Sequence, residues 1–398
     1  MSDFREIYRP TEEHEAFRAA VREVCTEKVA PHAAEVDELA EFPKASYEAI
    51  KAADFHAPHI PEQYEGVGAD ALATVIVIEE IARACASTSL IPAVNKLATV
   101  PWLLAGSEEI KQRYLPPIAR GEAMASYCLS EPEAGSDAVA MKTRAVRDGD
   151  HYVLNGVKRW ITNAGVSTFY TVFAVTDPDA RSRGISAFVV EKDDEGVSFG
   201  APEKKLGIKG SPTCEVYLDD VRIPADRMIG AEGTGFATAM RTLDHTRVTI
   251  AAQAIGIAQG ALHYALGYVT QRKQFGTVLA DFQGLQFMLA DSAMDLYASR
   301  LMVLHTAWKV EQGLPHRHEV AMTKTFVSEA FGRIADRAVQ MHGAAGIAMD
   351  LPIAGIYQDA RAARIYDGAS EVHRMVIARD MLKLAAQGES VRAASGEL

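Results

Sequence analysis

Cysteine is scarce in this sequence of 398 residues. The four cysteines, Cys25, Cys85, Cys128 and Cys214, lie far apart and form no CxxC or CxxxC pair. This spacing excludes a disulfide framework and gives no indication of a zinc site. The histidines lack a third partner as well, so we expect no metal. We expect four reduced, buried thiols, as in a cytoplasmic protein.

The sequence also has no excess of basic residues. Lysine and arginine number 41 against 53 acidic residues, which gives a net charge of −12. Such a chain is a poor general nucleic-acid binder, although a local basic site can still hold a phosphate. The apolar fraction of 48% excludes a disordered chain, and the length predicts two to three domains with large buried cores.

No segment is predicted to cross a membrane or to direct secretion. The first residues, MSDFREIYRPTEEHE, are charged and lack the apolar core of a signal peptide. The stretch between Arg247 and Arg272 has no charged residue and contains a GxxxG at Gly256 and Gly260. Polar residues such as Gln253 interrupt it, so we interpret it as a helix buried in a bundle or a subunit interface.

Residue patterns divide the chain into three domains, at 1–122, 123–235 and 236–398. The first shows helical periodicity, with one helix that begins near Glu12 and ends at Pro31 and another capped by Ser107. The second alternates in the manner of antiparallel strands, with a hairpin predicted around Asn155-Gly156. The third contains four long helical segments with short connections, typical of an up-down bundle: 236–270, 281–312, 318–343 and 370–386.

Two further patterns have simple interpretations. The GxGxxA at 66–71 follows no strand, so we interpret it as a loop rather than a dinucleotide site. Glu79 and Glu80 lie on a predicted helix and are interpreted as part of its solvated face.

Four separated segments have a composition suited to binding. Residues 127–137 (YCLSEPEAGSD) combine a tyrosine, hydroxyls and a small-residue turn that can present backbone N–H groups; an interdomain linker explains them equally well. Residues 158–165 (KRWITNAG) offer a flat aromatic face beside hydrogen-bonding groups. Taken alone, Trp160 fits a core position better.

The other two segments carry charge. Arg272 and Lys273 in QRKQFG, followed by Gln283, can neutralise phosphates or simply complement a helix C-terminus. In the segment 365–371 (IYDGASE), Asp367 precedes a predicted helix, where it or Ser370 is most simply an N-cap.

Together the four segments resemble the acyl-CoA dehydrogenase family, flavoenzymes that oxidise acyl-CoA thioesters between Cα and Cβ. The resemblance extends from about Glu12 to Leu384, with the segments in the family's order and spacing. It implies an α+β multidomain fold: an α-helical N-terminal domain, a middle antiparallel β-barrel and a C-terminal four-helix bundle. It also implies a homotetramer, a dimer of dimers, with FAD partly at a subunit interface.

The resemblance assigns FAD contacts to many positions. They are Tyr127, Leu129, Ser130, Ser136, Trp160, Thr162, Arg272, Phe275, Gln283, Gln340, Gly343, Ala344, Ala369 and Glu371. Arg272, Phe275 and Gln283 match residues that hold the FAD of a neighbouring subunit. Substrate contacts are assigned to Ser136, Asp244, Arg247, Tyr366 and Gly368.

The sequence departs from the family pattern mainly in the segment that carries the family's catalytic base. The usual Tyr-Glu-Gly-Thr, in which the Glu is the base, is here Tyr366-Asp367-Gly368-Ala369. The alternative base position holds Thr246, which cannot ionise, so Asp367 is the matched acid. Asp is one methylene shorter than Glu, about 1.5 Å of reach, and a displacement of about 1 Å can cost roughly a hundredfold in rate.

The resemblance therefore predicts an FAD-dependent acyl-CoA dehydrogenase that forms trans-2-enoyl-CoA and passes electrons to an electron-transfer flavoprotein. Two alternatives stay open. The same scaffold can act as an oxidase or on an atypical thioester, either carrier-protein-bound or non-fatty. It can also be a flavin- or CoA-binding protein with weakened catalysis. The sequence does not specify acyl chain length.

Overall fold

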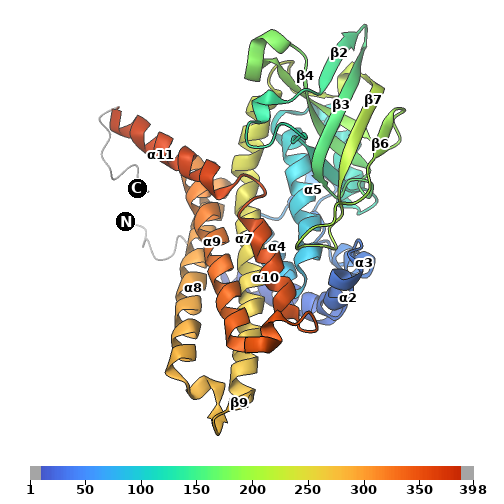
Figure 1. Ribbon diagram of the computed structural model, residues 1–398. Coiled ribbons are helices and arrows are strands. Elements are labelled where there is room, and N and C mark those ends of the chain that lie inside the picture. The colour runs from blue at the N-terminus through green and yellow to red at the C-terminus, as the bar shows by residue number, and fades with distance from the viewer. Residues whose placement is uncertain (1–9, 387–398) are drawn as a thin grey trace.

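The computed structural model describes residues 10–386, so the first nine residues of the charged N-terminal stretch lie outside the described residues. Helices form the N-terminal region, as predicted (Figure 1). They are α1 (Glu12–Val24), α2 (Ala33–Leu39), α3 (Lys44–Ala52), α4 (Ala71–Ala84), α5 (Ala86–Ala105) and α6 (Glu108–Ala119). Ser107 caps α6 as expected, because its side chain accepts a hydrogen bond from the N–H of Ile110.

Two details of this region differ from the sequence expectation. The first helix does not run on to Pro31: α1 ends at Val24, and a π-helical turn and a 3-10 turn lead into α2. Pro31 lies in the first turn of the 3-10 segment, where a missing N–H costs nothing. Helix α5 was not predicted, because Pro92 and Pro101 lie inside it. Most residues of α5 are buried, and this burial outweighs the poor helix propensity of the two prolines.

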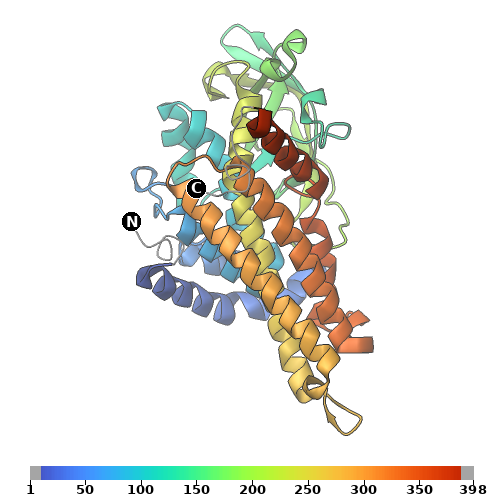
Figure 2. The same cartoon turned by 90° about the vertical axis from the view of Figure 1, so that its left-hand side faces the viewer.

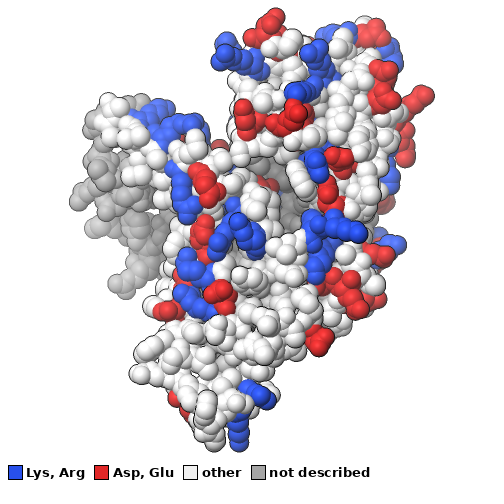
Figure 3. All heavy atoms as spheres, in the orientation of Figure 1, with Lys and Arg blue, Asp and Glu red and all other residues white. Residues whose placement is uncertain are grey.

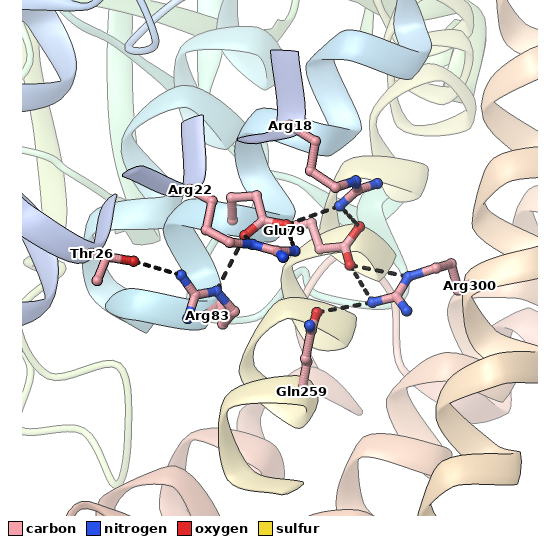
Figure 4. Close-up of polar contacts among 8 residues, drawn as sticks. Arg18, Arg22, Thr26, Glu79, Arg83, Gln259 and Arg300 are labelled. Atoms are coloured by element: carbon pink, nitrogen blue, oxygen red, sulfur yellow. Dashed lines mark hydrogen bonds and ion pairs between the residues drawn. The ribbon is translucent and has the colours of Figure 1, made fainter. Parts of the chain in front are cut away.

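The expectation of a solvated Glu79–Glu80 face is wrong. Glu79 is 3% exposed and Glu80 is fully buried. Arginines from three helices surround them (Figure 4): Arg18 and Arg22 of α1, Arg83 of α4 and Arg300 of α8 (Gln283–Glu311). Since charged side chains are buried only when paired, this network ties the N-terminal helices to the C-terminal ones.

The middle domain is the predicted β domain, a mainly antiparallel eight-stranded sheet. Its hydrogen-bonded order is β6-β7-β3-β2-β4-β5-β8, and β1 pairs in parallel with β4. The strands are β1 (Ala125–Cys128), β2 (Arg144–Asp148), β3 (His151–Thr162), β4 (Phe169–Val175), β5 (Ile185–Glu191), β6 (Val197–Phe199), β7 (Thr213–Pro224) and β8 (Met228–Ile229).

The prediction of a hairpin turn at Asn155-Gly156 is wrong. Strand β3 runs through both residues and pairs with β7, with a register shift between Leu154 and Gly156. Asn155 donates to Asp220 of β7, and a Cβ at Gly156 would lie 2.4 Å from Thr143 Oγ1. Asn-Gly here marks a bulge with close backbone approach rather than a turn.

The C-terminal region is a bundle around the long helix α7 (Gly235–Gln271), with α8, α9 (Arg317–His342) and α10 (Pro352–Ala363). A small hairpin of β9 (Lys273–Gln274) and β10 (Thr277–Val278) joins α7 to α8. Figure 2 shows α7, α8 and α9 running side by side. Helix α11 (Ser370–Ala386) packs on α9 and extends away from the bundle, so α10, which was not predicted, completes it (Figure 1).

Most of the uncharged segment of α7 is buried, from Val248 through Ala258, and it forms the centre of the largest hydrophobic core. Within residues 10–386 no helix is both long and apolar enough to cross a membrane. All four cysteines are free and buried, as expected.

Candidate functional site

The first two binding segments lie side by side in the middle domain. The N–H of Arg159 donates to Ser130 O at 2.9 Å, and Ser126 Oγ donates to Thr162 O at 2.7 Å. Beneath them Lys158 Nζ donates to Glu131 Oε1 at 2.7 Å, with both side chains buried. These bonds join the end of β1 to the end of β3, so Tyr127, Leu129 and Ser130 lie close to Trp160 and Thr162.

Trp160 is not a core residue. It is 55% exposed and has a φ of +63°, at a register shift between β3 and β7. The guanidinium of Arg159 lies 4.7 Å from the centre of its ring. A large aromatic side chain held at the surface in a strained backbone indicates a binding role.

The fourth segment forms a loop between α10 and α11, at the end of the bundle that faces the middle domain (Figure 1). Tyr366 Oη donates to Gln253 Oε1 at 2.6 Å and so anchors the loop to α7. Asp367 has a φ of +53° and Gly368 a φ of +99°, so the chain turns sharply at the acid. Figure 3 shows the surface hollowed between the middle domain and the α11 end of the bundle.

Asp367 is not a helix cap. Among the described residues, no hydrogen bond joins its carboxylate to an N–H of α11, which begins at Ser370. No backbone carbonyl of the described chain accepts from the N–H of Asp367 either. Burial raises the pKa of Asp367, while the nearby Lys324 and Arg247 lower it. Asp367 in turn contributes to a raised pKa of Tyr127, which burial mainly sets, so the two residues are close enough to interact.

The Asp244–Arg247 turn of α7 meets the same loop. Arg247 Nη1 donates to Asp244 Oδ1 and Nε to Asp367 O, both at 3.1 Å. Thr246 lies between them but is buried, and its hydroxyl donates to Thr242 O. The structure therefore brings Tyr127, Arg247 and Asp367 to one junction.

The remaining predicted FAD contacts lie elsewhere. Arg272, Phe275 and Gln283 surround the β9–β10 hairpin, at the end of the bundle opposite the middle domain (Figure 1). Phe275 is 95% exposed with a φ of +51°. His342, at the end of α9, stacks on Tyr268 near the end of α7. Gln340, Gly343 and Ala344, which flank His342, are exposed at the same end. One chain thus separates the predicted FAD contacts into two groups.

Three predicted contacts at the junction are less constrained. Ser136 is exposed in the loop after β1, Ala369 is half-buried before α11, and Glu371 is exposed in its first turn. Other site residues were missed by sequence reasoning: Lys324 of α9, His373 of α11 and the Lys158–Glu131 pair. A lysine and a histidine at apolar positions of predicted helices were the available signal for the first two.

Comparison with known proteins finds a match for each of the three regions of the fold. Three family models match: the N-terminal domain of acyl-CoA dehydrogenase at residues 11–122, the middle domain at 126–221 and the C-terminal domain at 233–382. The chain is 54% identical to the probable acyl-CoA dehydrogenase FadE25 of Mycobacterium tuberculosis, over 95% of this chain and 97% of the relative.

The chain belongs to the acyl-CoA dehydrogenase family. Its structure resembles that of butyryl-CoA dehydrogenase from Megasphaera elsdenii, with a TM-score of 0.92 and 35% identity over 94% of this chain and 99% of the other. It also resembles a chain from a study of the electron-transferring flavoprotein of Acidaminococcus fermentans, with a TM-score of 0.93 and 38% identity over 96% and 100%. The protein is an oxidoreductase that carries out FAD-dependent acyl-CoA dehydrogenation.

The residues present fit a flavin cofactor. Trp160 is 55% exposed beside Thr162, so a large aromatic surface is available to a planar heterocycle. At the other end of the bundle, Gly343 has a φ of +59° and open space around the position of a Cβ, which allows a ligand to approach the backbone. Arg272 supplies a cation there for a phosphate.

Proposed function

We propose that Asp367 is the catalytic base of this dehydrogenase. The observation that carries the proposal is the position of its half-buried carboxylate at the junction of the middle domain and the bundle, beside Arg247 and Tyr127. The alternative position on α7 holds Thr246, whose hydroxyl is directed into its own helix. Burial favours a pKa above that of an exposed Asp, which suits a general base.

In the proposed reaction the carboxylate of Asp367 takes the α-proton of the thioester. The β-hydrogen leaves with its electron pair, a carbon–carbon double bond forms, and the product is trans-2-enoyl-CoA. Bound FAD supplies the acceptor for that hydride. The free N–H of Asp367 would donate to the thioester oxygen, where negative charge develops as the α-proton leaves.

We assign the binding roles by position. Around the flavin ring would lie Tyr127, Leu129, Ser130, Trp160, Thr162, Ala369 and Glu371. Ser136 would contact both cofactor and substrate, and Asp244, Arg247, Tyr366 and Gly368 would contact the acyl-CoA. These assignments are supported by the convergence of β1, β3, α7 and the α10–α11 loop.

We further propose a homotetramer built as a dimer of dimers. Arg272, Phe275, Gln283, Gln340, Gly343 and Ala344 lie at the opposite end of the chain from Trp160, so both groups can serve FAD only if two subunits combine. Exposed apolar side chains on α8 and a largely uncharged lower bundle surface (Figure 3) support such an interface.

The physiological acceptor is proposed to be an electron-transfer flavoprotein, and the setting cytoplasmic fatty acid metabolism. The structural likeness to a chain from the Acidaminococcus electron-transferring flavoprotein study supports the acceptor. Four unpaired, buried cysteines support a reducing compartment.

The test is anaerobic reduction of the bound flavin by a panel of acyl-CoA thioesters, from butyryl-CoA upward. The wild-type protein should be yellow and should bleach with at least one thioester. Asp367→Asn should keep FAD and acyl-CoA binding but lose several orders of magnitude in rate, because an amide cannot accept the α-proton. Asp367→Glu restores the family's usual reach and should retain activity on straight-chain substrates.

Each alternative predicts a different outcome. A protein that binds FAD but is reduced by no thioester is a binding protein with weakened catalysis. A high peroxide yield in air identifies an oxidase, and reduction only by carrier-protein thioesters identifies an atypical substrate. Full reduction kinetics in Asp367→Asn would end the assignment of the base.

A further inference from the structure

Two cations hold the backbone on either side of Gly368. Arg247 Nε donates to Asp367 O at 3.1 Å, and Lys324 Nζ donates to Gly368 O at 2.7 Å. Lys324 comes from α9 and is only 1% exposed, so its ammonium is removed from water. A buried ammonium is costly unless it is paired and hydrogen-bonded, which makes its position beside this loop informative.

The loop needs such support. Asp367 carries a Cβ in the left-handed region, which only glycine adopts without cost. Gly368 follows at a φ of +99°, and a Cβ at this residue would lie 3.0 Å from His373 Nε2. The path of the chain at the acid is therefore fixed by its surroundings rather than by local preference.

Charged and titratable groups interact with Asp367 from several elements: Tyr127 of β1, Arg247 of α7, Lys324 of α9, His373 of α11 and the neighbouring Tyr366. Asp244 forms an ion pair with Arg247, and Glu329 and Glu371 act on Lys324. Burial lowers the pKa of His373 to about 3, so this ring is neutral at physiological pH. Among the described residues Lys324 has no carboxylate oxygen within 4 Å, and its hydrogen bond is to the carbonyl of Gly368.

We propose that Lys324 is a positioning residue for the catalytic base, holding the carbonyl of Gly368 so that the loop keeps the carboxylate of Asp367 directed at the acyl site. This inference rests on the proposed role of Asp367. A short carboxylate has little freedom to adjust its own reach, so its placement depends on the backbone that carries it. Burial raises the pKa of Asp367, and of the two cations that lower it Lys324 has the larger effect.

The experiment compares FAD-loaded wild type with Lys324→Met and Lys324→Arg, using butyryl-CoA and octanoyl-CoA. Anaerobic flavin reduction is followed from acid to alkaline pH. The acid limb of the rate profile is the pH range in which the reduction rate falls as the base becomes protonated. In Lys324→Met this limb should lie at least about one pH unit higher than in wild type, so the rate at acidic pH should be roughly tenfold lower. The rate should recover at higher pH, where Asp367 ionises without help. Lys324→Arg keeps the cation and should restore the wild-type limb.

A second measurement does not depend on turnover. The infrared band of a protonated carboxylic acid, assigned by its absence in Asp367→Asn, should persist to higher pH in Lys324→Met than in wild type. The matched control is Lys309→Met, which removes another buried ammonium, paired with Glu319 at 2.5 Å. It should lower the melting temperature without moving the acid limb.

The outcomes separate the two proposals. If Asp367→Asn abolishes reduction while Lys324→Met keeps the wild-type limb and infrared band, Lys324 has no positioning role. A loss of rate in Lys324→Met that is equal at all pH values also overturns the inference, because it indicates a structural defect. If Asp367→Asn reduces flavin normally, the base assignment itself has failed.

Discussion

At Asp367, burial and charge act in opposite directions on one carboxylate. Removal from water raises its pKa, and the cations of Lys324 and Arg247 lower it. A base that was only buried would hold its proton at neutral pH, and one that was only paired would be too weak to take a proton from carbon. If Asp367 is the base, as proposed, the rate depends on the balance of the two effects rather than on either alone.

At Asp359 of α10, burial outweighs the groups that favour the charged carboxylate. Its carboxylate accepts a hydrogen bond from the N–H of Ile208, but burial raises its pKa to about 7. The folded state then favours the protonated acid. The stability from this group is full below the unfolded pKa near 3.8 and is lost as pH rises towards 7.

We therefore predict that Asp359→Asn stabilises the protein at pH 8 and changes little at pH 4, because the amide keeps an acceptor and never ionises. The shift corresponds to about 4 kcal/mol at most. Thermal unfolding of both proteins across this pH range is the measurement. An equal change in melting temperature at both ends would contradict the prediction.

Individual residues show what could be predicted from the sequence and what could not. Asp367, Arg247 and Trp160 could be named as candidates because their types and order match a family pattern. Lys324 and His373 were missed, because their role exists only where α9 and α11 meet the loop. Glu79 and Glu80 were misjudged, since a local charge pair does not reveal the arginines that α1 and α8 bring from more than 50 residues away.

At the scale of elements, periodicity located most helices but failed where tertiary contacts override local preference. Helix α5 forms despite two prolines because its residues are buried between other elements. Strand β3 continues through Asn155-Gly156 because β7 pairs along nearly its whole length. The exact helices of the bundle depended on α10 (12 residues), which was not predicted and takes the place in the bundle that the sequence had assigned to α11.

The Glu80 network joins α1 to α4 and gives a prediction at this scale. Glu80 is buried, yet Arg22 and Arg18 outweigh burial and lower its pKa. Its stabilising contribution is present above the unfolded pKa and is lost as pH falls through the lowered folded value. Glu80→Gln should cost about 3 kcal/mol at pH 7, because it leaves buried arginine charge without its partner.

Urea unfolding at pH 7 and at pH 4 tests this, and the variant should be less sensitive to acid than wild type. The control is Glu48→Gln, which removes an exposed pair with Lys51 and should cost less than about 1 kcal/mol. Equal losses in both variants would show that the network contributes no more than a surface pair.

At the scale of the whole molecule, one face of α8 is unexplained by the single chain. Phe287, Met294, Tyr297 and Leu301 are exposed apolar residues spaced seven, three and four apart, so they form one stripe along the helix. A stripe of this kind is typical of a subunit interface. The two groups of predicted FAD contacts lie at opposite ends of the chain and independently support the proposed interface.

We therefore predict that Met294→Lys combined with Tyr297→Lys dissociates the assembly and releases FAD together. Charges in an apolar interface cannot be desolvated without partners, and separated subunits lose the Arg272–Gly343 end from the site near Trp160. Light scattering should report the 43.1 kDa monomer, and absorbance should show loss of the flavin. Leu39→Lys, at an exposed apolar residue of α2, is the control and should change neither. A double variant that is monomeric yet saturated with FAD would show that one chain holds the whole cofactor, and the division of the site between subunits would be wrong.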